Sequence, residues 1–357
     1  MSELLNKLRK NSTIKESAIL ADSKFFNKKD MITTAIPAIN IALSGKIDGG
    51  LTPGLTMWAG PSKHFKTMFS LIMAKSYMDK YADAILLFYD SEFGTPQSYF
   101  DSMGIDTKRI LHTPITDVEQ LKFDIMQQVN QLGRDDHCII VIDSIGNLAS
   151  KKEVDDALDG KSVGDMTRAK QLKSLFRMVT PHLTMKDIPM VVVNHTYMTL
   201  EMFSKPVVGG GTGSYYSADN IFILGRQQDK DGKELTGYNF IINVEKSRYV
   251  REKSKIPIEV SFEGGLSKWS GLLDMALDSG HVIKPKNGWY QRVDMETGEV
   301  GEKSYREKDT NTKDFWLPIL KSKSFSAYVE NTYCISHGAI IREEDTVSEV
   351  YADLDED

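Results

Sequence analysis

Short apolar runs that end in polar residues recur along the chain. Four of them predict β-strands: LTMWAG (55–60), AILLFYD (84–90), CIIVIDS (138–144) and PMVVVNH (189–195). Apolar and polar residues do not alternate within these runs, so we expect strands that are buried on both faces. Helical patterns separate the runs, which predicts an α/β core with a mostly parallel central sheet. Ligands of such sheets bind beyond the carboxyl ends of the strands, where the polar endings would lie.

The segments between the runs carry the helical period. Residues 66–77 predict one helix, and TDVEQLKFDIMQQVNQL (116–132) predicts another. In the second, Thr116 and Glu119 have the spacing of a capping box. One face of this helix is apolar and is expected to be buried, at Val118, Leu121, Ile125, Val129 and Leu132.

Three more strand-like stretches follow the predicted parallel region, at 220–226, 238–246 and 255–262. Short turns join them, so we expect largely antiparallel strands that extend the sheet. Beyond about residue 270 the composition becomes more polar, which is typical of a separate small domain.

The two ends of the chain differ from the core. Leu4, Leu5 and Leu8 have helical spacing, and SKFF (23–26) places two aromatic residues before a polar turn. Two readings remain open: a short helix packed on its own domain, or a helix and aromatic knob that dock on a neighbouring subunit. We expect an N-terminal helical segment, a core, a small C-terminal α+β domain and a mobile acidic tail, at 1–30, 31–269, 270–341 and 342–357.

Composition narrows the class of protein. The 357 residues contain no apolar run near the length of about 18 residues that suggests a membrane span, and the first residues lack the apolar stretch of a secretion signal. Cys138 and Cys334 are too few for a disulfide framework and fit a reducing cytoplasm. We therefore expect a cytoplasmic protein without a membrane partner. The net charge is −6, so any nucleic-acid site must be local.

GPSKHFKT (60–67) matches a phosphate-binding loop at every position but one. Gly60 opens the motif, and Lys66 and Thr67 close it between a predicted strand and a predicted helix. Backbone N–H groups there would bind phosphates, the lysine would face the β- and γ-phosphates, and the hydroxyl would hold Mg²⁺. Phe65 replaces the second glycine; helix-like dihedrals with the ring packed outside the loop would tolerate it. The alternatives are an inactive site or a chance match.

Polar residues near other strand ends supply candidate chemistry. Asp143 can hold Mg²⁺ or its water shell, or simply cap the next turn. Glu92 is a candidate general base that would orient and deprotonate an attacking water. Asn194 and His195 can sense a γ-phosphate by hydrogen bonding, although a loop histidine bonded to the backbone is the ordinary alternative.

Five segments, in their sequence and in their order along the chain, resemble the RecA-family recombinases, and they are most similar to those of T4-like phages. They are GPSKHFKT, LLFYDSEFGTPQSY, CIIVIDSIGNLASKKE, VVVNHTYMTLEMFSKPVVGGGTG and VEKSRYVREKSK. The resemblance spans about residues 20–340 and implies a RecA-like P-loop ATPase core. It further implies an ATP-dependent DNA strand-exchange recombinase with ATP and Mg²⁺ as cofactors. The alternatives are a ring-forming helicase of the same fold, an ATP-binding scaffold without turnover and a small-molecule kinase.

By the same resemblance, the nucleotide is held by the whole loop, with Tyr99 stacked on adenine. The loop residues are Gly60, Pro61, Ser62, Lys63, His64, Phe65, Lys66, Thr67 and Met68. Lys66 and Glu92 take catalytic roles, and Thr67 and Asp143 bind Mg²⁺.

The resemblance also assigns a switch and two cations. Asn194 and His195 form the γ-phosphate switch, where most relatives carry Asn-Gln, so a histidine changes the coupling near neutral pH. Lys246 and Arg248 match paired catalytic cations that reach a neighbour's ATP across a filament interface. Without the resemblance, both would be read as exposed cations at a strand end.

Two long segments, 150–170 and 196–213, resemble the family's DNA-binding loops, and long loops without regular structure are commonly functional. Met166 and Phe203 would wedge between bases, cationic residues would meet phosphates, and glycines would allow close backbone approach. The remaining candidates are Arg168, Lys170, Lys205, Gly209, Gly210 and Gly211. The implied partners are single- and double-stranded DNA, other copies in a helical filament, a phage single-strand binding protein and a recombination mediator.

Overall fold

The computed structural model describes residues 3–23, 30–161, 166–199, 204–232 and 234–335. Most of the predicted aromatic knob at 23–26 and all of the acidic tail at 342–357 lie outside these ranges. Within them, no helix is both long and apolar enough to cross a membrane.

The described core is built on a sheet with the strand order β11-β10-β9-β8-β1-β5-β4-β2-β3. The strands are β1 (Gly54–Ala59), β2 (Ile85–Asp90), β3 (Ile110–Pro114), β4 (Cys138–Asp143), β5 (Pro189–Asn194), β8 (Asn220–Asp231), β9 (Glu234–Lys246), β10 (Lys255–Ser261) and β11 (Gly265–Leu266). The block from β8 to β3 is parallel, which confirms the predicted parallel sheet. β9, β10 and β11 are antiparallel. β8 itself runs parallel to β1, so the chain direction changes one strand later than the turn pattern suggested.

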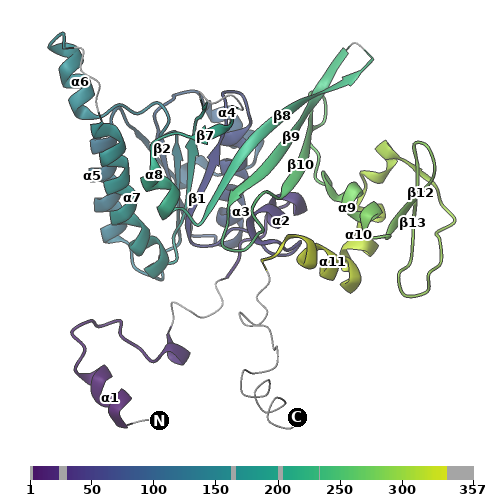
Figure 1. The fold of residues 1–357 in the computed structure, drawn as a ribbon, viewed down its shortest axis with the longest axis horizontal. Coiled ribbons are helices and arrows are strands. Elements are labelled where there is room, and N and C mark those ends of the chain that lie inside the picture. The colour runs from purple at the N-terminus through teal and green to yellow at the C-terminus, as the bar shows by residue number, and fades with distance from the viewer. Residues whose placement is uncertain (1–2, 24–29, 162–165, 200–203, 233, 336–357) are drawn as a thin grey trace, which may run out of the picture.

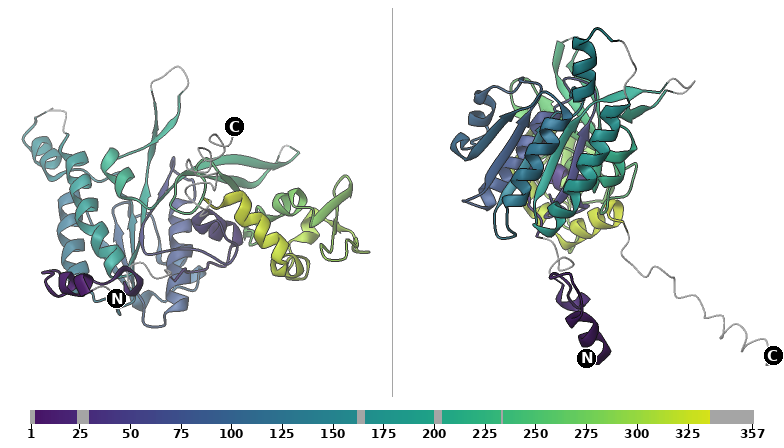
Figure 2. Two further views of the ribbon diagram at one scale, coloured as in Figure 1. Left: turned by 60° about the horizontal axis from the view of Figure 1, so that its bottom comes forward. Right: turned by 90° about the vertical axis from the view of Figure 1, so that its left-hand side faces the viewer.

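Helices cover both faces of the sheet because its strands are apolar on both sides (Figures 1 and 2). Trp58 of β1 packs into the layer under α2 (Pro37–Ser44) and α3 (Lys66–Lys80), whereas Met57 packs into the layer under α5 (Val118–Gln131) and α7 (Thr167–Met185). The other helices of the core are α4 (Gln97–Ser102), α6 (Lys151–Leu158) and α8 (Thr212–Ser217), with short 3₁₀ turns at Leu20–Asp22 and Thr107–Arg109.

The start of α5 differs from the predicted capping box. Asp117 is the N-cap, and its side chain accepts a hydrogen bond from the backbone N–H of Gln120 at 2.8 Å. The Thr116 hydroxyl instead donates to the Gln120 side-chain oxygen at 3.0 Å, and Glu119 accepts from the backbone N–H of Lys151. An aspartate caps at least as well as a threonine, so the helix begins one residue later than expected. The predicted apolar face of α5 is buried except at its last residue.

The N-terminal helix α1 (Glu3–Lys10) contributes nothing to the core. Leu4, Leu5 and Leu8 are 63%, 41% and 59% exposed, and the helix has no buried residue. It lies apart from the sheet in the view of Figure 1. Packing of this helix on its own domain is therefore wrong for this chain, and docking on a neighbour stays a prediction.

A small α+β unit follows the core. It contains α9 (Leu272–Asp278), a sheet of β12 (Val282–Lys286), β13 (Trp289–Arg292) and β14 (Tyr305–Arg306), a 3₁₀ turn at Glu307–Thr310, α10 (Lys313–Lys321) and α11 (Lys323–Tyr333). After α11 the chain returns to the core, where the backbone of Cys334 pairs with that of Val250 in an isolated antiparallel β-bridge. The Cys334 thiol also contacts the carbonyls of Ser44 and Gly45 at the end of α2.

Replacing Gly45 with alanine should loosen this return contact. Gly45 has φ +74°, and an added Cβ would lie 2.5 Å from the sulfur of Cys334. Left-handed strain and the clash together should lower the unfolding free energy by about 2–4 kcal/mol. Gly265→Ala is the matched control, because Gly265 has φ +66° with nothing within 4 Å; it should cost about 1 kcal/mol. Denaturant unfolding measures both variants. If Gly45→Ala and Gly265→Ala lowered the unfolding free energy equally, the contact between Gly45 and Cys334 would not contribute to stability.

Candidate functional site

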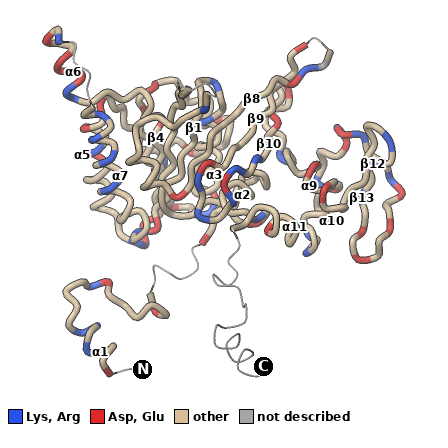
Figure 3. Tube along the Cα trace, viewed as in Figure 1, with Lys and Arg blue, Asp and Glu red and all other residues tan. Residues whose placement is uncertain are grey.

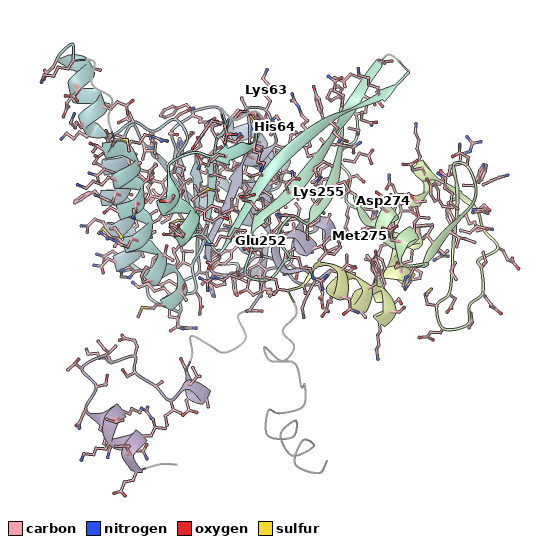
Figure 4. The ribbon with its side chains drawn as sticks, viewed as in Figure 1. Lys63, His64, Glu252, Lys255, Asp274 and Met275 are labelled. Carbon is pink, nitrogen blue, oxygen red and sulfur yellow. The ribbon has the colours of Figure 1, made fainter. Side chains whose placement is uncertain are left out.

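The predicted phosphate loop lies between β1 and α3, at the carboxyl end of the parallel strands. Figure 4 shows Lys63 and His64 at that end of the sheet. Lys66 begins α3 and is only 6% exposed, and its Nζ donates to the carbonyl of Pro61 at 2.8 Å. Burial lowers the pKa of Lys66, while Glu92 and Asp143 raise it. The lysine is therefore folded over its own loop and faces two carboxylates.

Phe65 holds a left-handed conformation, with φ 59° and ψ 14°. The helix-like dihedrals expected for it are wrong, and Lys63 has a similar φ of 61°. The ring does pack outside the loop, with centroids 5.0 Å from Phe240 and 6.3 Å from Phe69. Such backbone strain costs about 1–3 kcal/mol. Each aromatic pair contributes about 0.5–1.5 kcal/mol, so the ring contacts offset most of that strain.

Thr67 and Asp143 meet beside the loop. The threonine hydroxyl donates to Asp143 Oδ2 at 2.6 Å, while the buried Oδ1 has no hydrogen-bond partner in the described structure. Burial raises the pKa of Asp143 to about 6. A buried oxygen without a partner, next to a hydroxyl and a phosphate cradle, fits Mg²⁺, which takes one or two protein oxygens beside substrate phosphates.

Glu92 belongs to a hydrogen-bonded cluster. Its Oε1 accepts from the Ser144 hydroxyl at 2.5 Å and lies 3.1 Å from His195 Nε2. These bonds, that of His195 first, hold the pKa of Glu92 at about 2 against the effect of burial. The carboxylate is thus ionised and weakly basic, so the geometry suits orienting a water better than removing its proton.

Asn194 and His195 join this cluster to the following loop. Asn194 Nδ2 donates to the carbonyl of Gly209 at 2.8 Å, and the backbone N–H of Gly209 donates to the carbonyl of His195 at 2.9 Å. Sequence reasoning missed Gly146, where an added Cβ would lie 2.0 Å from the His195 ring. The signal in the sequence was a glycine shortly after Asp143, the last residue of a strand, because glycine allows a side chain to approach the backbone closely.

The two predicted DNA loops contain more regular structure than expected. In 150–170, Ser150 and Glu153 form a capping box at the start of α6. In 196–213, β6 (Thr196–Met198) pairs with β7 (Pro206–Val208) as an antiparallel hairpin. The hairpin begins directly after His195, so the Glu92 cluster and this loop share one strand end.

The candidate DNA-contacting side chains divide into two groups. Met166 is 83% exposed, and Lys170 and Lys205 are exposed as well. Arg168 is not: its guanidinium donates to the carbonyls of Ile145, Gly146 and Leu148, so it holds the turn after β4. Phe203 lies outside the described residues. Tyr197 and Met198 of β6, which sequence reasoning missed, are 57% and 56% exposed.

Lys246 and Arg248 do not meet the phosphate loop of their own chain. Lys246 is paired with Ile221 at the start of β8, whereas the loop follows the carboxyl end of β1. Its Nζ donates to the carbonyl of Tyr215 at 2.8 Å, and Arg248 forms an ion pair with Asp219. Tyr99, on α4, is 45% exposed.

Comparison with known proteins gives matches along nearly the whole chain. The RecA N-terminal domain family matches residues 2–267, and the family described as Bacteriophage T4, Recombination and repair protein, C-terminal domain matches residues 269–329. The chain is 54% identical over 354 residues to the Recombination and repair protein of Enterobacteria phage T4, covering 98% of this chain and 90% of that protein.

Weaker similarities cover part of the chain. Protein RecA of Bacteroides thetaiotaomicron is 27% identical over 274 residues, covering 76% of this chain and 80% of that protein. The crystal structure of the RadB recombinase aligns with a TM-score of 0.48 at 17% identity, covering 66% of this chain and 98% of that chain. With a family match over most of its length and a close relative matched from end to end, this chain belongs to the RecA family.

Proposed function

We propose that this protein is an ATP-dependent strand-exchange recombinase that forms helical filaments on single-stranded DNA and pairs it with homologous duplex. It would act in phage recombination, repair and recombination-dependent replication. One observation carries the proposal: Asn194 and His195 bond to Gly209 on one side and to Glu92 on the other. A change at the γ-phosphate can therefore reach the hairpin loop through direct hydrogen bonds. Family membership favours a recombinase over a ring-forming helicase.

The cradle supplies the nucleotide chemistry. Backbone N–H groups of the loop and of the first turn of α3 would bind the phosphates of ATP. Lys66 would exchange its bond to the Pro61 carbonyl for a phosphate oxygen, since ammonium binds an anion more strongly than a carbonyl. Thr67 and Asp143 would hold Mg²⁺, which neutralises developing charge on the phosphates.

Glu92 would orient the attacking water, held in place by Ser144 and His195. Loss of the γ-phosphate would alter this cluster and with it the Asn194 bond to Gly209. DNA affinity would then fall because the loop loses its ATP-dependent arrangement.

The second half of the site would come from the next subunit. Lys246 and Arg248 lie at a strand end remote from their own cradle, which suits cations that act in trans. A head-to-tail interface of this kind is heterologous and generates an open helix. The exposed leucines of α1 would add a docking element to that interface.

DNA contacts are assigned to the exposed groups of the two loops. Met166 and the β6 residues Tyr197 and Met198 would contact bases, while Lys170 and Lys205 would contact phosphates. Figure 3 shows acidic and basic residues interspersed along α6 and α7. Stacking and backbone contacts are tolerant of sequence, so base pairing would supply the specificity. By analogy with the family, we also propose that the protein acts in the host cytoplasm. Its partners there would be a single-strand binding protein and a recombination mediator.

Lys66→Ala should abolish function without unfolding the protein. Loss of the cradle cation should reduce DNA-dependent ATP hydrolysis at least about 100-fold and eliminate joint molecules. Lys75→Ala, on the same helix and paired with Asp79 at the surface, should leave both unchanged. Phosphate release and joint-molecule assays measure the two effects. Joint molecules formed normally by Lys66→Ala would refute the ATP-dependent role.

Asp143→Asn should separate stability from catalysis. Because burial raises the pKa of Asp143 from 3.8 to about 6, the native protein without metal loses stability as the pH rises through that interval. Asparagine removes this cost, so the variant should be more stable at pH 8 by up to about 3 kcal/mol and nearly equal at pH 4. Its Mg²⁺-dependent ATP hydrolysis should be lost. Denaturant unfolding in the presence of a chelator measures the unfolding free energy of both proteins. An Asp143→Asn variant no more stable than wild type at pH 8 would contradict the raised pKa of Asp143.

Mixing two inactive variants should restore turnover. Glu92→Gln and Lys246→Ala each remove one half of the proposed shared site. In equimolar mixed filaments, about one quarter of interfaces should combine an intact Glu92 with an intact Lys246 from the next subunit. ATP hydrolysis should recover to about that fraction of the wild-type rate. A mixture no more active than either variant alone would place both groups in one subunit's site.

A further inference from the structure

The buried carboxylate of Asp90 holds the turn that carries Glu92. Asp90 ends β2 and is 4% exposed. Its Oδ1 accepts hydrogen bonds from two successive backbone N–H groups, those of Glu92 at 3.0 Å and Phe93 at 2.8 Å. Its Oδ2 lies 3.2 Å from Nε2 of His112. Both oxygens are thus in use, and both bonds of Oδ1 go to the turn.

This turn needs an external hold. Phe93 has φ 54°, a left-handed conformation for a bulky residue, and its side chain is 62% exposed. The exposed ring cannot repay the strain by packing, unlike the ring of Phe65. The two bonds from Asp90 therefore stabilise a backbone shape that the turn would not keep by itself.

The base of the same turn is fixed separately. The Ser91 hydroxyl donates to the carbonyl of Ser144 at 2.7 Å and accepts from its backbone N–H at 3.0 Å. Ser144 also donates its hydroxyl to Glu92. Ser91 thus ties the turn to β4, and Asp90 sets the angle at which Glu92 leaves it.

His112 connects Asp90 to the edge strand of the sheet. It belongs to β3, the last strand in the sheet order, and its side chain is half exposed. The ring stacks at 5.7 Å on Phe88 of β2, which fixes its orientation toward Asp90. The two strands are paired in parallel register across this contact, with Phe88 opposite His112.

We propose that Asp90, oriented by His112, is a positioning residue for Glu92 in ATP hydrolysis. The inference rests on the proposed function, because it assigns to Glu92 the orientation of the attacking water. The required property of Asp90 is a fixed hydrogen-bond acceptor and not its charge. An ordinary strand-end cap would contribute to stability alone and would leave the catalytic constant of the folded protein unchanged.

The test compares Asp90→Ala with Asp90→Asn in the full-length protein on single-stranded DNA. Alanine removes the acceptor, so kcat for ATP hydrolysis should fall about ten- to hundredfold with KM nearly unchanged, the pattern of an interaction made only in the transition state. Asparagine keeps an acceptor oxygen for the two N–H groups, so its kcat should stay within about threefold of wild type. His112→Ala should lower kcat by a smaller factor, and it should add nothing when combined with Asp90→Ala.

The matched control is Asp106→Ala. Asp106 makes the same kind of bond, accepting from the backbone N–H of Lys108 at 3.0 Å, but at an exposed turn away from Glu92. Its loss should leave kcat unchanged. Affinity for a fluorescent ATP analogue should match wild type in every variant, which reports an intact cradle.

Three results would overturn the inference. They are an unchanged kcat in folded Asp90→Ala, a parallel loss of analogue affinity, and failure of asparagine to restore kcat. If alanine prevents folding, the asparagine and His112→Ala variants decide the question by the same criteria. Wild-type protein without DNA-dependent hydrolysis would instead refute the proposed function, so the two failures are distinguishable.

Discussion

The site depends on the parallel register of four neighbouring strands. β1, β5, β4 and β2 all end at one edge of the sheet, because each is paired in parallel with the next. That constraint brings together the phosphate loop, Asn194, Asp143 and the Glu92 turn from distant parts of the chain. Each polar group follows an apolar strand that is buried on both faces, so its position is set by packing of the core.

The pKa values of the two carboxylates in this cluster shift in opposite directions. Asp143 is pushed toward its neutral form by burial, whereas Glu92 is held ionised by His195 and Ser144. Two adjacent carboxylates with separated pKa values can take different tasks, one as a cation ligand and one as a water-orienting group. Lys66 interacts with both carboxylates, because each of them raises its pKa while burial lowers it.

Much of this arrangement was predictable from sequence, because apolar runs and their polar endings are local patterns. The resemblance assigned both Thr67 and Asp143 to Mg²⁺, and the hydrogen bond between them is consistent with that shared role. The left-handed Phe65 was not predictable, because its strain is offset by Phe240, which lies far along the chain. Arg168 was misjudged for a similar reason: a cation in a loop suggests phosphate contacts, but three backbone carbonyls surround its guanidinium.

The contact of Phe65 with Phe240 ties the cradle to the antiparallel extension of the sheet. Most phosphate loops are self-contained, since glycine needs no support from elsewhere. Here the motif and its supporting ring form one packing unit, split between the start of α3 and β9. Transplanting this loop into a protein with no aromatic residue at the place of Phe240 would therefore leave the strain at Phe65 without its ring contact.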